Sequence, residues 1–407
     1  MKFDDRALAQ TSTSPVSLLA RLPRFLVRNR FNRHEWAGAF GDLGTLIPFV
    51  VGYISVVGME PGGVLFGFGA AMLVSGMVYG TPFPVQPMKA IGAVATAQSS
   101  HAIISSATVG AAGLVTGAIW LLIGATGMAK RLHEWVSNSV GSGIVIGLAL
   151  SLLAVGIKML TGDWILGIAT LAVTLLLLRQ TAIPVMFLLL VASAIVALVQ
   201  DQSLAHELGA IHPRLHLPAP VLGTLSWSDM GTAALLLALP QLPLTLGNAV
   251  VATTRENNRL FPERPVSENK LMLSTGVMNV GSAILGGVPM CHGAGGMAAH
   301  VRFGARTGGA PIILGLILLV LAMFFSSSIH TLFRMFPAPI LGVILMLAAA
   351  QLASGPWSTA KRSTNSEKSV IATTALVCLW NVGAGFLVGL LLDHGIRLWR
   401  RRRGISQ

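Results

Sequence analysis

Residues 84–93 read PVQPMKAIGA, and residues 287–296 read GVPMCHGAGG. The pairs Pro87-Met88 and Pro289-Met290 align 202 positions apart, which is about half of the 407-residue chain. Each pair opens a run of small residues inside apolar sequence. Matched breaks in the two halves of a polytopic membrane protein indicate a binding site at the bilayer midplane. The two stretches therefore predict a transporter built from a duplicated fold.

The composition is that of an integral membrane protein. The chain is 53% hydrophobic and 11% charged, with a mean hydropathy of +0.73, whereas soluble domains carry about 25% charged residues. A spanning helix needs roughly 20 apolar residues, and the apolar runs predict fourteen spans, several of them short. The predicted spans are 35–57, 61–80, 86–102, 107–129, 137–157, 163–178, 181–200, 229–252, 268–286, 289–300, 309–326, 330–353, 368–380 and 382–398.

The net charge of +13 is explained by topology. With the N-terminus placed in the cytoplasm, fourteen spans put most of the 28 Lys and Arg residues on the cytoplasmic side, as the positive-inside rule requires. The charge therefore does not indicate nucleic-acid binding. We expect a multi-pass protein of the cell (inner) membrane with both termini in the cytoplasm. Lys89 is the single Lys or Arg that this topology places within the membrane.

The fold is predicted to be all-α with a seven-plus-seven inverted repeat. Seven spans precede the loop 201–228 and seven follow it, and an odd-numbered unit repeated in tandem must be inverted. The first span of each half is interrupted, because residues 41–49 read GDLGTLIPF and residues 239–248 read LPQLPLTLGN. A proline inside a helix frees a carbonyl group, which must be satisfied by protein or by a wet cavity. Both spans should therefore face the protein interior.

The two breaks predict an oxyanion site. We expect Pro87 and Pro289 to be the first residues of short helices, where a missing N–H has no cost. In an inverted repeat the two helix N-termini face each other, and each offers free donors and about half a positive charge. Gly293, Gly295 and Gly296 would let a ligand approach the backbone. The alternative is that proline and glycine merely kink the helices. No enzyme motif, metal-ligand spacing or cofactor motif accompanies the breaks, so we expect neither catalysis nor a cofactor.

Two charged residues are candidates for chemistry at these breaks. Lys89 would lie buried in the first turn of its helix, and a buried cation requires a bound anion, Asp42, or both; the alternative is that it snorkels to an interface. Asp42 lies about 10 Å into the first span at 1.5 Å per residue. A carboxylate at this depth is a natural proton-coupling group, although a structural or capping aspartate is the alternative.

The remaining candidates are polar or small residues around the breaks. His292 could donate to an oxyanion or titrate near neutral pH, or it could be a plain hydrogen-bonded histidine, and Cys291 is read as a small filler. Neutral amides and hydroxyls suit an oxyanion but also hold membrane helices together. Asp42 is the candidate for proton coupling. The candidate substrate-binding residues are Thr45, Gln86, Pro87, Met88, Lys89, Ala90, Gln241, Asn248, Met290, Cys291, His292 and Gly293.

Five stretches of this chain resemble the molybdate transporter family, a branch of the sulfate permease superfamily. The stretches are FGDLGT at 40–45, PVQPMKAI at 84–91, PQLPLTLGN at 240–248, PMCHGAGG at 289–296 and FGARTG at 303–308. The resemblance spans the whole membrane part of the chain, and the second and fourth stretches are quite specific. It implies high-affinity uptake of molybdate, with sulfate and tungstate as related tetrahedral dianions.

The resemblance also implies a core domain that moves against a gate domain in an elevator-like alternation of access. Proton coupling is expected, and the partners are the oxyanion and membrane lipid, with a homodimer left open. A sulfate transporter, or a passive anion channel on the same fold, remains the alternative. The expected segments are a cytoplasmic tail at 1–34, a core domain at 35–130 and 229–326, a gate domain at 131–228 and 327–398, and a basic tail at 399–407.

Overall fold

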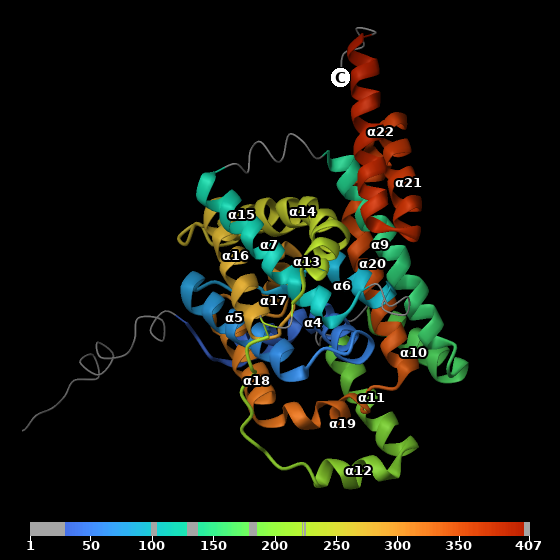
Figure 1. Ribbon diagram of the computed structural model, residues 1–407. Helices are drawn as coiled ribbons and strands as arrows, with labels where there is room; N and C mark the ends of the chain where they lie inside the picture. Colours follow the sequence, from blue (N-terminus) through green and yellow to red (C-terminus); the bar gives the residue numbers. More distant parts are fainter. Residues whose placement is uncertain are drawn as a thin grey trace, which may run out of the picture.

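The structure is a computed structural model that describes residues 29–98, 104–127, 137–178, 185–221, 223 and 225–402. It is helical almost throughout (Figure 1). The predicted tail at 1–34 falls mostly outside these residues, as does the end of the basic tail. The elements of the first half are α3 (Arg33–Ala39), the 3₁₀ turn η1 (Phe40–Asp42), α4 (Leu43–Val51), the π-helical η2 (Gly52–Val56), α5 (Pro61–Tyr79), β1 (Gln86–Pro87), α6 (Lys89–Gln98), α7 (Ser106–Thr126), α9 (Asn138–Leu160), α10 (Trp164–Leu177), α11 (Val185–Gln200) and α12 (Gln202–Gly209).

The second half repeats this order of long helices, short strand and short helix. Its elements are α13 (Trp227–Thr232), the π-helical η5 (Ala233–Ala238), α14 (Leu239–Leu244), the π-helical η6 (Thr245–Ala252), α15 (Thr253–Leu260), α16 (Glu268–Ile284), β2 (Met290–Cys291), α17 (Ala294–Arg302), α18 (Gly309–Phe325), the 3₁₀ turn η7 (Ser326–Ser328), α19 (Ile329–Phe333), α20 (Ala338–Arg362), α21 (Asn365–Trp380) and α22 (Val382–Arg402).

Every segment predicted as a span contains a helix. Within the described residues, eight helices are long and apolar enough to cross a membrane, and a ninth results if α11 and α12, bent by 109°, form one span. The eight are Arg33–Val56, Pro61–Tyr79, Ser106–Thr126, Asn138–Leu160, Trp227–Leu260, Gly309–Phe333, Ala338–Arg362 and Val382–Arg400. The chain is therefore a helical, multi-pass membrane protein.

The fold departs from the prediction in three places. Residues 201–228, predicted as a loop, contain α12, and the span predicted to start at 330 is a short α19 followed by α20 from Ala338. The prediction of an all-α fold misses two strands, β1 and β2, which pair antiparallel with Gln86 opposite Cys291 and Pro87 opposite Met290. A strand of two residues is too short to show the period-two alternation by which strands are recognised.

The helices pack as close pairs at which glycines face each other. The helix α5 lies along α18, and α9 lies along α20. At the second pair, a Cβ added to Gly156 would lie 2.7 Å from the Gly342 carbonyl oxygen, and one added to Gly342 would lie 2.5 Å from the Gly156 oxygen. Glycine is required where two helix backbones approach this closely. Figure 1 shows α5, α16 and α18 on one side of the molecule and α9, α20, α21 and α22 on the other.

The short helix α3 holds the start of α18 through a buried carboxylate. Glu35 is 2% exposed. Its Oε1 accepts from the N–H groups of Arg306 and Thr307 at 2.9 Å each, and its Oε2 accepts from Ala310 at 3.0 Å. The free donors at a helix start are thus satisfied by a residue more than 270 positions away. The stretch FGARTG at 303–308 leads into α18, and its Arg306 and Thr307 supply two of these backbone donors.

Replacing Glu35 with alanine is expected to destabilise the protein strongly. Three backbone donors would be left buried without an acceptor, and losing one side of a buried charged contact costs about 3–5 kcal/mol. Thermal unfolding in detergent measures the change. Glu60→Ala is the matched control, because Glu60 also accepts two backbone N–H groups, at the start of α5, but is exposed, so its loss should cost only about 1 kcal/mol. Equal effects of the two changes would contradict this role for Glu35.

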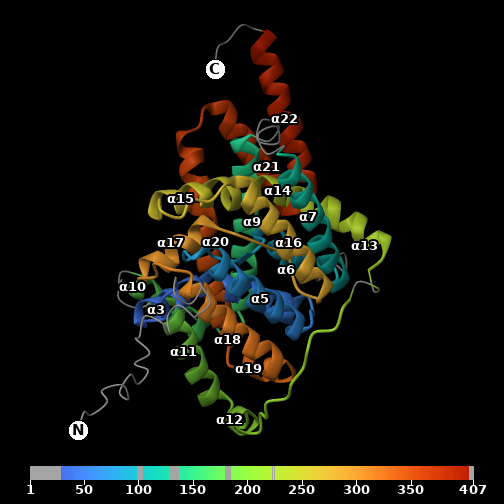
Figure 2. The ribbon, with the colours of Figure 1, turned by 90° about the vertical axis from the view of Figure 1, so that its left-hand side faces the viewer.

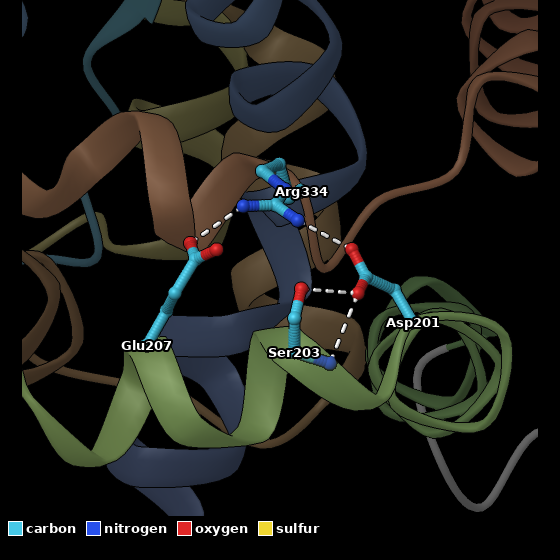
Figure 3. Close-up of polar contacts among 4 residues, drawn as sticks. All are labelled: Asp201, Ser203, Glu207 and Arg334. Atoms are coloured by element: carbon cyan, nitrogen blue, oxygen red, sulfur yellow. Dashed lines mark hydrogen bonds and ion pairs between the residues drawn. The ribbon is translucent and has the colours of Figure 1, made fainter.

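A cluster of charges fixes α12 against α19 (Figure 3). Arg334 donates to Glu207 at 2.5 Å and also bonds Asp201, whose other oxygen accepts from Ser203 at 2.6 Å (hydroxyl) and 3.1 Å (backbone). The Ser203 hydroxyl and the Arg334 guanidinium hold the pKa of Asp201 below its usual value. The ionised Asp201 carboxylate makes this contact. Its contribution to stability is complete above the ordinary pKa of aspartate and is lost as the pH falls through the lowered pKa. The α12 end of the molecule lies opposite to the C-terminal end of α22 (Figure 1).

Candidate functional site

The two sequence breaks pair directly with each other. The Met88 N–H donates to the Pro289 carbonyl at 3.0 Å beside the β1–β2 ladder. The helices that follow begin at Lys89 and at Ala294, so the prediction that Pro87 and Pro289 open these helices is wrong. Pro87 lies in the ladder opposite Met290, whose N–H and carbonyl are both bonded to Asn279, so the missing N–H of proline leaves no group of Met290 without a partner. The helix starts are therefore displaced from the prolines by the ladder.

The second break is held from behind by α16. Asn279 accepts the Met290 N–H at 2.8 Å and donates to the Met290 carbonyl at 2.6 Å and to the Thr275 carbonyl at 2.7 Å. Ser282 donates to the Val288 carbonyl at 3.0 Å. The α16 residues Thr275, Asn279 and Ser282 were not among the sequence candidates. Their spacing of four and three positions places Thr275, Asn279 and Ser282 on one face of a helix, and that polar face was the available signal.

The His292 side chain points away from the helix starts and toward α16. Its Nδ1 lies 2.8 Å from the Pro84 carbonyl and its Nε2 lies 2.7 Å from the Ser274 hydroxyl. Because the carbonyl can only accept, Nδ1 carries a proton. The rings of Tyr79 and Phe83 meet the imidazole edge-on. The histidine therefore ties the two breaks together, and both ring nitrogens already have protein partners.

The start of α6 is held by the interrupted helix of the other half. Gln241, in α14, accepts the Ala90 N–H at 2.8 Å through Oε1 and donates to Thr245 at 2.9 Å through Nε2. Both side chains are buried. The π-helical η6 continues from Thr245 and carries Asn248, and π-helical turns inside α-helices occur frequently at functional sites. The prediction that the eighth segment faces the interior is confirmed for Gln241 and Thr245.

Asp42 and Gln86 lie together against the first turn of α17. Gln86 Nε2 donates to Asp42 Oδ1 at 2.5 Å, and the two residues are 1% and 2% exposed. The other oxygens, Gln86 Oε1 and Asp42 Oδ2, have no hydrogen-bond partner among the described residues. A Cβ added to Gly293 would lie 2.1 Å from Gln86 Oε1, and one added to Gly296 would lie 2.8 Å from Asp42 Oδ2. The glycines thus make room for both side chains.

Lys89 is the first residue of α6 and is partly exposed. Its ammonium group has no hydrogen bond or ion pair to the part of the chain that the structure describes. Cys291 is buried and unoxidised, and Met88 and Met290 lie in the hydrophobic core. A cation at a helix N-terminus opposes the helix dipole. The position of Lys89 therefore favours a bound anion.

A cavity of about 470 Å³ approaches the helix starts between α9, η6 and α20. Asn248 lines this cavity, and its Nδ2 lies 3.8 Å from a Cβ added to Gly293. A second, polar cavity of about 410 Å³ shares Asn138 and Thr359 with the first and includes Arg362. Both cavities lie beside the start of α9 and the last turn of α20, which carries Lys361 and Arg362. Figure 2 shows the C-terminal end of α22 at the end of the molecule opposite to α12.

The arrangement has the chemistry of an oxyanion site. Two helices begin beside one paired ladder, and a lysine side chain lies at one start. Helix starts attract anions through free N–H groups and the helix dipole. Thr45 lies one turn beyond Asp42 and interacts with it. Within the described residues no three His, Cys, Asp or Glu side chains gather where they could hold a metal ion.

The fold is shared with solved anion transporters. The transmembrane domain of a cyanobacterial bicarbonate transporter, BicA, superposes with a TM-score of 0.61 and 15% identity, over 91% of this chain and 97% of that one. The anion transporter SLC26A9 superposes with a TM-score of 0.64 and 12% identity, over 93% of this chain and 67% of that one. At these identities the likeness shows the fold.

Sequence comparison identifies the family. The family described as "Molybdate transporter of MFS superfamily" matches residues 34–152 and 233–352, which together form more than half of the chain. Molybdate transporter 2 of Arabidopsis thaliana is 28% identical, over 88% of this chain and 87% of that protein. Molybdate transporter 1 of Chlamydomonas reinhardtii is 40% identical over 49% of this chain and 40% of that protein. The chain belongs to this molybdate transporter family.

Proposed function

We propose that the protein takes up molybdate as a secondary active transporter. The observation that carries the proposal is the pair of helix starts, α6 and α17, joined by the Met88–Pro289 hydrogen bond with Lys89 at one start. A cation at a helix start suits a tetrahedral dianion. The family match and the relatives named for molybdate transport support molybdate as the substrate. Sulfate and tungstate share its charge and shape.

The anion is proposed to lie between Lys89 and Ala90 at one start and Gly293 at the other. Gln86 and Asn248 would face it, and Lys89 would supply the positive charge. Gln241 and His292 would act through the backbone: Gln241 orients the Ala90 amide, and His292 fixes the Pro84 carbonyl. Pro87, Met88, Met290 and Cys291 would shape the walls, and Thr45 would lie behind Asp42.

The proposed architecture is fourteen spans in a seven-plus-seven inverted repeat, with both termini in the cytoplasm. Two observations support it. Every predicted segment contains a helix, and the family matches one region in each half of the chain, at 34–152 and at 233–352. Residues 35–130 with 229–326 would form the core domain that carries both helix starts. Residues 131–228 with 327–398 would form the gate domain. Because the cavity beside Asn248 lies between α9, α20 and η6, the structure fits a state open to the cytoplasm in an elevator-like cycle.

Uptake of a dianion into a negative-inside cell requires coupled cations. Each charge costs about 2.3 kcal/mol per 100 mV, so more than two protons per dianion are needed for net inward positive charge. Asp42 is the proposed proton-coupling residue. It is buried, it bonds Gln86, and one of its oxygens faces the first turn of α17.

Calorimetric titration of the detergent-purified protein with molybdate, with sulfate as competitor, tests the substrate. We expect saturable molybdate binding that excess sulfate displaces poorly. Preferential sulfate binding would identify a sulfate transporter instead. In reconstituted vesicles, saturable uptake without unitary currents is expected, and unitary currents would identify a passive channel. Absence of binding of either anion would overturn the proposed substrate class.

A further inference from the structure

We propose that the side-chain amide of Gln86 reports the protonation state of Asp42 to the anion site by turning over. This inference rests on the proposed oxyanion function and deepens it. When Asp42 is ionised, the amide would present its oxygen to the site and oppose anion binding. When Asp42 is protonated, the amide would present its NH₂ group and bind the anion. Proton binding and anion binding would then reinforce each other.

The structure shows the first of these two arrangements. Gln86 Nε2 donates to Asp42 Oδ1 at 2.5 Å, and Gln86 Oε1 is buried without a partner among the described residues. That oxygen is directed at the start of α17, since a Cβ added to Gly293 would lie 2.1 Å from it. An ionised carboxylate can only accept hydrogen bonds. Ionised Asp42 therefore requires the amide nitrogen on its own side and leaves the carbonyl oxygen toward the site.

Protonation of Asp42 reverses this requirement. A protonated carboxyl group has an O–H to donate, and the Gln86 oxygen is the stronger acceptor within reach. A half-turn about the last side-chain torsion exchanges the amide oxygen and nitrogen at almost no change in shape, and that torsion is broad and roughly two-fold. Gly293 leaves the space in which the amide group lies. After the turn, the amide NH₂ group points to the site and can bind an oxyanion.

Coupling of the two ligands follows from linkage. If the anion binds only the turned amide, and the turned amide is favoured only by protonated Asp42, the anion must raise proton affinity by the same factor by which the proton raises anion affinity. A buried carbonyl oxygen facing an anion is unfavourable, so the empty, ionised site would reject the anion. Gln86 would thus couple protonation of Asp42 to anion binding without direct contact between the carboxyl group and the anion.

The groups beside Asp42 come from four elements. The titratable ones are His300 in α17 and Lys89 in α6, while Thr45 lies one turn along in α4 and Gln86 in β1 donates to its Oδ1. The Nδ1 atom of His300 lies 2.7 Å from the Gly38 carbonyl, so this nitrogen carries a proton. Gln86 is the group among these that contacts both Asp42 and the start of α17.

Proton uptake measured during anion binding tests the proposal. Molybdate is titrated calorimetrically into the wild type near pH 7 in two buffers of different ionisation enthalpy, with sulfate as a second ligand. We expect about one proton taken up per anion, and affinity that weakens as pH rises. In Asp42→Asn the side chain cannot ionise, and its amide can bond Gln86 in either orientation, so anion binding should lose its pH dependence and take up no proton. Asp163→Asn, at the exposed start of α10, should behave as wild type.

The variant Gln86→Met tests the role of the amide while Asp42 stays in place. Methionine has a similar volume and no strong hydrogen-bonding group, so anion affinity should fall about 10-fold for one lost charge-assisted bond, and proton uptake should fall with it. Infrared difference spectra of the wild type on adding molybdate should show a carboxylate becoming a carboxylic acid. This measurement does not depend on the folding of a variant. Anion binding without proton uptake, or equal uptake in wild type and Asp42→Asn, would overturn the inference while leaving the transporter function intact. Wild-type protein that binds neither anion would overturn the function and the inference together.

Discussion

Replacing Lys89 with alanine is expected to weaken molybdate binding by about 100-fold. The ammonium group lies at the start of α6 without an ion-pair partner among the described side chains, and in the proposed complex the dianion provides its compensation. Truncating one partner of a buried charged pair costs 2–5 kcal/mol, and about 2.7 kcal/mol corresponds to 100-fold. Calorimetry on the purified variant measures the loss.

The matched control for this change is Lys158→Ala. Lys158 is exposed at the C-terminal end of α9, and its removal should leave affinity within about two-fold, because exposed charges contribute little. Unfolding temperatures of both variants should stay close to that of the wild type. Wild-type affinity in Lys89→Ala would show that the anion binds elsewhere.

Replacing Gly296 with alanine is expected to reduce uptake by two orders of magnitude or more. The added Cβ would lie 2.5 Å from Gln86 Nε2, 2.8 Å from Asp42 Oδ2 and 2.8 Å from Pro84 Cβ. Real Cβ atoms do not approach other atoms so closely, so Gln86 or the β1 backbone must move. Displacing a positioning group by about 1 Å can cost about 100-fold in rate. Uptake of labelled molybdate into vesicles with reconstituted protein measures the effect.

Gly295→Ala serves as the control for this glycine pair. It makes the same chemical change one residue away, and a Cβ at Gly295 has no atom within 4 Å. Folding and membrane insertion should match the wild type in both variants, and the large loss of uptake should be confined to Gly296→Ala. Similar uptake by the two variants would contradict the packing of Gln86 and Asp42 against α17.

The sequence was sufficient to predict a helix in every proposed span and to single out the two breaks. Long apolar runs identify helices such as α9 and α20 without reference to their neighbours. The alignment of Pro87-Met88 with Pro289-Met290 identified two segments that the structure joins by a hydrogen bond. These features could be predicted because each depends on local composition or on an internal repeat.

The sequence was not sufficient to predict contacts made across the fold. The ladder is two residues long, and because of it the helices begin at Lys89 and Ala294 and not at the prolines. Glu35 caps α18 from more than 270 positions away, and local sequence carries no sign of such a partner. The orientation of His292 was also open, because a histidine beside a glycine run can face a ligand or the backbone behind it. Its direction depends on Ser274, on another helix.

The most direct test of the proposed anion site is to locate the anion itself. Crystals grown with tungstate, a heavier tetrahedral dianion, would give an anomalous difference map that marks the metal without reference to side-chain density. We predict one strong peak between the starts of α6 and α17, within hydrogen-bonding reach of the Lys89 ammonium group. A strong peak elsewhere, with none between these helix starts, would contradict the site.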